Sequence, residues 1–260
     1  MVVTITGSGT SQGVPVIGCE CKVCLSNNKK DKRLRSSVHI LYKEKSIVID
    51  TGPDFRQQMI NNNIKNLDAV LFTHEHKDHV AGLDDVRPFN FIQKKPIDIF
   101  CNHQVFMALK REFHYIFDPK FQYPGIPKIN RYEISKKKFF IKEKIKVEPI
   151  EVMHYKLPVL GFRIENFAYL TDAKTISINE KEKLKNLDLL IVNALRVKEH
   201  LSHFNLEEAL SLIKELEPKK AILTHISHYM GLHDDVQNTL PENISVGYDN
   251  QKIILNNHEN

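Results

Sequence analysis

The segment 73–79, Thr-His-Glu-His-Lys-Asp-His, holds four potential metal ligands within six residues. It directly follows a continuous apolar run at 69–73, a pattern typical of a strand buried on both faces. In an extended segment His74 and His76 project to the same side, because side chains two positions apart share a face. Asp78 and His79 then turn toward a neighbouring point. One short segment can therefore bind two metal ions that lie close together.

Three more potential ligands stand at the ends of other apolar runs. His154 follows Val-Glu-Pro-Ile-Glu-Val, Asp172 ends Ala-Tyr-Leu-Thr-Asp, and His225 ends Ala-Ile-Leu-Thr-His. Open α/β sheets place their sites at the carboxyl ends of strands, so these side chains can meet the first segment at one edge. Neutral imidazole and carboxylate ligands suit Zn²⁺, and also Mn²⁺ or Fe²⁺.

A second cluster lies in a polar segment of about thirty residues between the first two predicted strands, a length that calls for a functional or structural reason. Cys19, Cys21 and Cys24 fall within six positions of it, and His228 follows His225 by three residues. A set of three Cys and one His is typical of a structural zinc site. Such a site would tie the long segment to the strand end that carries His225. Free thiols and a redox pair at Cys21 and Cys24 remain the alternatives.

The remaining patterns indicate which elements hold these ligands. Strands alternate with helices, which indicates an α/β protein, and no change in composition marks a linker, so we expect a single domain over residues 1–260. The predicted strands are 2–7, 36–42, 46–50, 69–73, 97–101, a hairpin at 136–152, 159–166, 167–172, 187–192 and 220–225. The predicted helices are 54–62 with Asp54 as cap, one starting near 79, 103–116, and 205–218 with Asn205 as cap.

Composition narrows the class of protein. The 260 residues include 13 His and 4 Cys, with Lys+Arg 37 against Asp+Glu 32, a net charge of +5 that fits an anionic ligand. No apolar run approaches the roughly 20 residues of a membrane helix, and the start lacks the basic and apolar regions of a signal peptide. Three clustered Cys fit a metal in a reducing compartment better than a secreted disulfide framework. We therefore expect a cytoplasmic protein.

The segment at 73–79, followed by Ala-Gly, resembles the H-x-H-x-D-H signature of the metallo-β-lactamase superfamily. The resemblance implies a four-layer αββα sandwich of two pseudo-symmetric halves, with a two-metal site along one edge. It places His74, His76 and His154 on the first metal, Asp78, His79 and His225 on the second, and Asp172 between both. The commonest β-lactamases carry Cys in place of that Asp. Asp172 therefore favours the phosphodiesterase, RNase Z or glyoxalase II branches.

The Cys cluster points to one branch. Together with the opening glycine loop and the sequence Ser-His-Phe-Asn-Leu-Glu-Glu-Ala at 202–209, it is similar to the PhnP-type phosphoribosyl 1,2-cyclic phosphate phosphodiesterases. This resemblance implies two catalytic ions (Zn or Mn), one structural Zn, and a metal-bridged hydroxide that attacks phosphorus. It makes His203 the candidate general acid or phosphate clamp. Asp78 can orient the hydroxide as well as bind metal.

Other residues are candidates for binding the substrate or are expected to have no catalytic part. Ser8, Thr10 and Ser11 of the glycine-rich loop can offer hydroxyl and N–H groups to a phosphate, and Arg87 can face the substrate anion. We interpret His39, within a strand pattern, as a core histidine. The others expected to have no catalytic part are His103, His114, Cys101 and His200.

Three functions compete. The first is hydrolysis of a small cyclic or diester phosphate by a protein that needs no membrane or nucleic acid and can form a homodimer. The second is an RNase Z-like endonuclease that trims tRNA 3′ ends, against which the modest net charge and the lack of a long basic arm both argue. The third is a non-enzymatic, metal-stabilised binding module, which a complete ligand set argues against.

Overall fold

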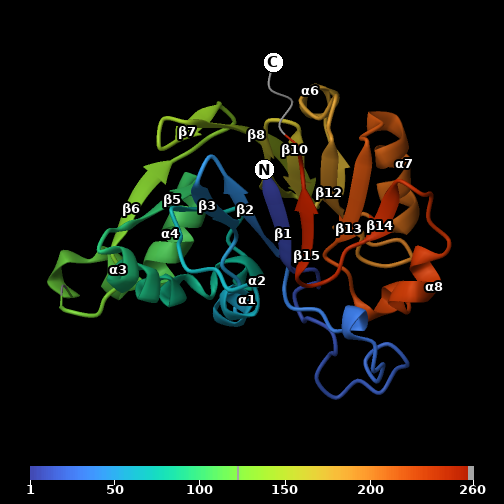
Figure 1. The fold of residues 1–260 in the computed structure, drawn as a ribbon, viewed down its shortest axis with the longest axis horizontal. Helices are drawn as coiled ribbons and strands as arrows, with labels where there is room; N and C mark the ends of the chain where they lie inside the picture. Colours follow the sequence, from blue (N-terminus) through green and yellow to red (C-terminus); the bar gives the residue numbers. More distant parts are fainter. Residues whose placement is uncertain (122, 257–260) are drawn as a thin grey trace.

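The computed structural model describes residues 1–121 and 123–256, and these form two β-sheets packed face to face between two layers of helices (Figure 1). The first sheet has the strand order β15-β1-β2-β3-β4-β5-β6. The second has the order β11-β8-β9-β10-β12-β13-β14, with β7 paired to β8. The αββα sandwich that the motif implied is therefore confirmed.

Most of the predicted strands are present, and four further strands, at Ile129–Glu133, Thr175–Ile176, Ile244–Val246 and Gln251–Ile254, were not predicted. In the first sheet they are β1 (Val2–Gly7), β2 (Ser37–Tyr42), β3 (Lys45–Ile49), β4 (Ala69–Leu71), β5 (Ile97–Cys101), β6 (Ile129–Glu133) and β15 (Gln251–Ile254). In the second they are β7 (Phe139–Ile141), β8 (Ile145–His154), β9 (Leu157–Ile164), β10 (Phe167–Leu170), β11 (Thr175–Ile176), β12 (Leu189–Asn193), β13 (Lys220–Thr224) and β14 (Ile244–Val246).

The helices cover the outer faces of the two sheets. Against the first sheet lie α1 (Phe55–Asn61), α2 (Lys77–Val80), α3 (Arg87–Gln93), α4 (His103–Glu112) and α5 (His114–Phe117). Against the second lie α6 (Ile178–Glu182), α7 (Leu206–Leu216) and α8 (His233–Gln237). The helix predicted at 103–116 is divided in two, because Phe113 leaves the helical conformation with φ −116° and ψ 44°.

Two predicted helix caps have different outcomes. Asn205 caps α7 and forms a capping box with Glu208, each side chain bonding the other residue's backbone N–H. Asp54 precedes α1 as predicted but makes no side-chain cap. Its carboxylate instead accepts hydrogen bonds from the backbone and guanidinium of Arg35, at 2.8 and 3.1 Å.

The hydrophobic core explains why the two sheets pack face to face. One cluster fills the space between the sheets and takes members from both, such as Ile5 and Ile40 from the first and Tyr169 and Ile191 from the second. Separate clusters lie between each sheet and its own helices. Long apolar strands buried on both faces therefore make the two central layers, as continuous apolar runs predict.

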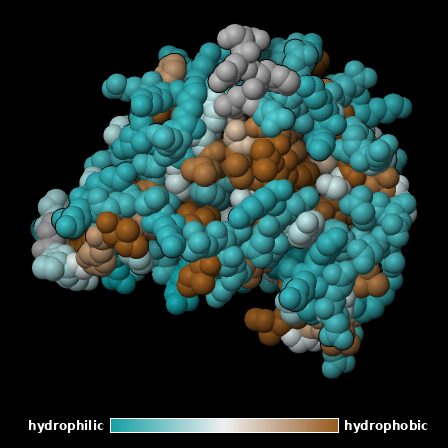
Figure 2. Space-filling model, viewed as in Figure 1, coloured by the Kyte–Doolittle hydropathy of each residue, from teal (hydrophilic) through white to brown (hydrophobic). Residues whose placement is uncertain are grey.

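Figure 1 shows the N-terminal strand β1 beside β15, the last strand of the described chain. The amino group of Met1 bonds the carbonyl of Leu255 at 2.9 Å. Figure 2 shows a mostly hydrophilic surface with a broad apolar area over the line between the two sheets. Among the residues that the structure describes, no helix combines the length and apolar character needed to cross a membrane.

Candidate metal centre

The predicted ligands meet at one edge of the sandwich because the strands that carry them run in the same direction. β3 and β4 are parallel neighbours, as are β10, β12 and β13. Their carboxyl ends therefore reach the same edge. Three residues just after strands hold the left-handed backbone conformation: Asp50 (φ 64°), Asp172 (φ 56°) and His225 (φ 56°). Such strained positions cluster at functional sites.

Four predicted ligands form the first group: the ligand atoms of Asp78, His79, Asp172 and His225 lie within 4.8 Å of one another. Nε2 of His79 lies 3.1 Å from Oδ2 of Asp78 and 3.2 Å from Oδ2 of Asp172. Nδ1 of His225 lies 3.4 Å from the same oxygen of Asp172.

The other predicted ligands lie next to this group, and the ring centroid of His74 is 4.3 Å from that of His79. The ring centroid of His76 lies 4.5 Å from that of His74 and 5.2 Å from that of His154. His154 and Asp172 also form a close group with His203, whose Nε2 lies 3.0 Å from Oδ1 of Asp172. Asp172 therefore faces both groups, one oxygen toward each, as a bridging carboxylate would.

Hydrogen bonds select which nitrogen of three of these histidines faces the centre. Nδ1 of His79 donates to Asp50 at 2.7 Å, and Nδ1 of His154 donates to the carbonyl of Ser202 at 2.9 Å. Nδ1 of His74 lies 2.9 Å from the hydroxyl of Thr73, which itself donates to Asp50. In each ring Nε2 keeps its lone pair for a ligand, the arrangement found around metal-binding histidines.

Two of those nitrogens test whether the centre fits a metal ion. Nε2 of His74 is buried and has no hydrogen-bond partner among the described residues, and Nε2 of His79 is buried with only the carboxylates of Asp78 and Asp172 beside it. An unpaired buried polar atom is costly unless another group satisfies it. A set of imidazoles and carboxylates around such atoms fits a divalent ion of the Zn²⁺ or Mn²⁺ kind.

The charges of the centre also favour a cation. Burial opposes the charged form of His79, but the carboxylates of Asp78, Asp172 and Asp50 outweigh it and raise its pKa well above the usual value, so they favour a cation at Nε2, either a proton or a metal ion that replaces it. Burial alone would raise the pKa of Asp172, yet the neighbouring His225 and His79 hold it well below its ordinary value. The lowered pKa of Asp172 keeps this carboxylate ionised, so it attracts positive charge.

The second predicted cluster is also assembled. The Sγ atoms of Cys19, Cys21 and Cys24 lie 3.3, 3.4 and 3.5 Å from Nδ1 of His228. The backbone N–H of Cys24, which bonds the Cys21 sulfur, is the largest influence lowering the pKa of Cys21 to about 6. All four cysteines are free rather than paired. Four converging ligand atoms fit the structural zinc interpretation.

The glycine-rich loop has a different part from the one predicted. The hydroxyl of Ser8 is fully buried, donates to Asp249 at 2.8 Å and accepts from Arg33, so it has no contact left for a substrate. Gly7 is required because a Cβ there would lie 1.9 Å from the carbonyl of Arg35. The loop therefore packs backbone against backbone, and this corrects the prediction for Ser8.

The other residues predicted to bind the substrate lie in different surroundings. The hydroxyl of Thr10 lies 3.2 Å from Nε2 of His225, so Thr10 borders the metal centre. Ser11 is exposed, and its carbonyl accepts from Arg35. Arg87 donates to the carbonyl of Gly125 at 3.1 Å and pairs with Asp84 at 3.6 Å. Arg87 therefore bonds the loop at Gly125, and because its side chain is 45% exposed its part as a substrate contact stays a prediction.

Several residues around the centre were not identified from sequence. Asp50 accepts hydrogen bonds from both His79 and Thr73. Nδ1 of His200 lies 3.2 Å from Nδ1 of His203. Asp50 carried the same signal as Asp172 and His225, a polar residue that ends an apolar run. His200 had no such signal, because its contact forms within an irregular loop.

Comparisons with known proteins agree with this architecture. The β-lactamase superfamily domain matches residues 45–226. A solved structure described as a new diphosphatase from the PhnP family is 36% identical, covers 98% of each chain and superposes with a TM-score of 0.91. The short form of human tRNase Z is 20% identical, covers 98% of this chain and 99% of its own, and has a TM-score of 0.70, which shows a shared fold.

A curated protein of Porphyromonas gingivalis, named octanoyltransferase, is 42% identical over 253 residues. The match covers 96% of this chain but 51% of that protein. This chain therefore spans about half the length of that relative.

Proposed function

This chain belongs to the β-lactamase superfamily, and on that basis we propose that it is a metal-dependent hydrolase of small phosphodiesters or cyclic phosphates. The observation that carries the proposal is the double group of His and Asp ligands that shares Asp172. The buried Nε2 atoms of His74 and His79 suit two divalent ions, and all seven ligands that the sequence motif implied lie around them.

The side chains have distinct parts in this proposal. His74, His76 and His154 would hold one ion, Asp78, His79 and His225 the other, and Asp172 would contact both. Divalent ions in such a centre supply an activated water for attack on phosphorus and neutralise charge on its oxygens. The Cys cluster would hold a separate structural zinc.

His203 would donate the proton that the leaving oxygen needs. Its ring is stacked on His225 with centroids 5.0 Å apart and lies edge-on to His154 at 4.5 Å. It stands 9% exposed at the border of the centre, where a substrate oxygen can reach it. Its Nδ1 is held by Ser202 and His200, at 3.1 and 3.2 Å. That support keeps Nε2 directed into the centre, where it lies 3.0 Å from Oδ1 of Asp172 beside the position proposed for the substrate.

Support for a phosphate substrate comes from the relative described as a diphosphatase, which is similar over 98% of both chains. The likeness to tRNase Z extends to the fold alone, so a tRNA substrate gains no support from it. The name octanoyltransferase belongs to a protein twice as long. Acyl transfer through a covalent intermediate needs an activated nucleophile such as a thiolate. Cys101 is buried within β5, and burial raises its pKa to about 11. The other three Cys are drawn together at His228.

The decisive experiment compares five substrates on one zinc- or manganese-loaded sample whose metal content is measured. These are bis-p-nitrophenyl phosphate, ribose 1,2-cyclic phosphate 5-phosphate, a dinucleoside diphosphate, a tRNA precursor and an octanoyl thioester. We expect turnover on one or more of the first three, and its loss in His76→Ala and Asp172→Ala. His103→Ala, an exposed histidine on α4, is the control and should keep full activity. Turnover on the tRNA or thioester alone would contradict the proposal.

A further inference from the structure

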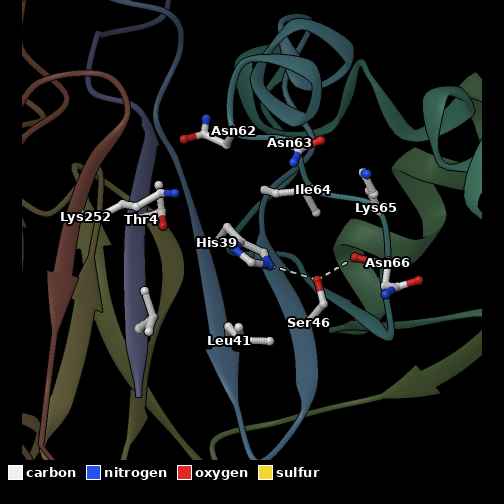
Figure 3. A pocket seen from close by; sticks show the side chains of 11 residues that line it. Thr4, His39, Leu41, Ser46, Asn62, Asn63, Ile64, Lys65, Asn66 and Lys252 are labelled. Carbon is white, nitrogen blue, oxygen red and sulfur yellow. Dashed lines mark hydrogen bonds between the residues drawn. The ribbon is translucent and has the colours of Figure 1, made fainter.

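A cavity of about 310 Å³ lies on the outer face of the first sheet and shares no lining residue with either metal cluster (Figure 3). Its floor is a patch of β1, β2, β3 and β15 that no helix covers, and its wall is the loop 62–66 between α1 and β4. Cross-strand pairing places Thr4 beside both His39 and Lys252. Ligand pockets run from about 300 to 1,000 Å³, so this one suits a small molecule.

The floor presents a histidine with one nitrogen left free. His39 is 9% exposed, and its Nε2 lies 2.8 Å from the hydroxyl of Ser46. That hydroxyl lies 2.6 Å from the carbonyl of Asn66, which can only accept, so the single proton of Ser46 points to Asn66. His39 must therefore donate from Nε2 to Ser46, and its Nδ1 carries a lone pair.

Two polar atoms of the floor have no partner among the described residues. Nδ1 of His39 and the hydroxyl of Thr4 take part in no hydrogen bond within the described residues. Neither atom is fully buried, so a ligand in the cavity can reach both. Burial, reinforced by the charge of Lys252, lowers the pKa of His39 to about 4, so the ring is neutral near pH 7. The floor therefore offers an acceptor, at Nδ1, to a ligand that must donate.

The rim supplies charge of one sign. Lys65 and Lys252 line the cavity, no Asp or Glu does, and neither lysine has an ion pair within the described part of the chain. The amides of Asn62, Asn63 and Asn66 add further polar groups around the loop. An anion at the rim would gain charge-assisted hydrogen bonds.

Apolar side chains of the cavity indicate a third property of the ligand, a carbon surface. Val2, Leu41 and Ile64 give the cavity an apolar side that can contact carbon atoms. Bare phosphate satisfies the lysines but leaves this side and the acceptor on His39 unused. A phosphorylated polyol satisfies all three, because it has an anionic end, hydroxyl donors and a carbon face.

We propose that the cavity between the outer face of β1–β2–β3 and the 62–66 loop is an accessory binding site for a small sugar phosphate, separate from the metal centre. The phosphate contacts one of the two lysines, Lys65 or Lys252, which lie on opposite sides of the cavity, and a hydroxyl donates to Nδ1 of His39. This site does not depend on the proposed hydrolysis, since none of its residues belongs to the metal centre.

The test is a residue-resolved titration of the zinc-loaded, full-length chain by ¹H–¹⁵N NMR, with ribose 5-phosphate, inorganic phosphate and ribose as probes. Ribose 5-phosphate should shift the amides of residues 62–66 and Lys252 saturably, and the two partial probes should bind there at least about tenfold more weakly. Signals from 73–79 report the metal centre independently. Shifts confined to 73–79 would overturn the proposal.

Variants separate a built site from general attraction of anions. Lys65→Ala with Lys252→Ala should weaken binding at 62–66 by about tenfold or more, and should leave hydrolysis at the metal centre unchanged. His39→Phe, which retains a ring without the acceptor, should remove the preference for ribose 5-phosphate over phosphate. Lys137→Ala with Lys138→Ala removes the same charge elsewhere and should bind normally. Equal weakening in this control pair would refute the site.

Discussion

Nδ1 of His79 donates a hydrogen bond to Oδ2 of Asp50 at 2.7 Å, and both side chains are fully buried. Asp50 ends the strand run of β3, whereas His79 lies in the one-turn helix α2 after β4. The same carboxylate accepts from the hydroxyl and the backbone N–H of Thr73, both at 2.8 Å. Asp50 thus fixes both the start of the ligand segment, at Thr73, and its end, at His79.

Asp50→Asn should reduce metal affinity by about 10- to 100-fold, the usual effect of removing a carboxylate behind a metal-binding histidine. The amide cannot stabilise the ring as a charged acceptor does. Metal content after dialysis against a graded chelator measures the effect. Asp68→Asn, which removes a buried carboxylate bound to Lys95, should lose stability and keep its metal. Equal metal loss in both variants would show that Asp50 acts only through the fold.

His203→Gln should lower kcat by about 10²- to 10⁴-fold for a diester with a poor alkoxide leaving group. The effect on bis-p-nitrophenyl phosphate should be much smaller, because p-nitrophenolate leaves without a proton. Metal content should not change. If both substrates lose the same factor, His203 acts as a phosphate clamp or a metal ligand rather than as the acid.

Cys21→Ser should lower the zinc content by about one ion per chain, because a structural zinc site needs its full set of ligands. The thermal midpoint should fall, since the segment 8–36 would lose its attachment to His228. Turnover by the folded fraction should change far less. Cys101→Ser supplies the comparison, as Cys101 lies alone within β5. An unchanged zinc count in Cys21→Ser would refute the structural site.

His39 should make the protein less stable as the pH falls. Its pKa is lowered from 6.5 to about 4 by burial, so between these values the unfolded chain takes up a proton that the folded chain refuses. Stability from this residue is complete above pH 6.5 and is lost toward pH 4, about 2 kcal/mol of it by pH 5. Urea unfolding at pH 7.5 and pH 5 measures it. His39→Gln should lose correspondingly less over that interval than the wild type, and the exposed-site variant His103→Gln should match the wild type.

The sequence alone determined the chemistry of the main centre and the ends of the elements that carry it. Ligands such as His74, Asp172 and His225 each follow an apolar run, and parallel strands bring such ends to one edge whatever the loops do. The alternating and continuous apolar runs likewise predicted most strands. These features depend on neighbours in the chain, so a linear pattern contains them.

Only the tertiary structure decided how residues far apart in the chain share their hydrogen bonds. Ser8 was predicted to bind phosphate, but its hydroxyl is taken by Asp249, 241 positions away. Arg87 is held by Gly125, and Nε2 of His79 is freed for a ligand because Asp50 takes Nδ1. His39 was expected to be an ordinary core histidine, yet the 62–66 loop makes it the floor of a cavity. Which polar atoms of a side chain remain available for a ligand depends on the hydrogen-bond partners that folding brings to it, and no local sequence pattern specifies those partners.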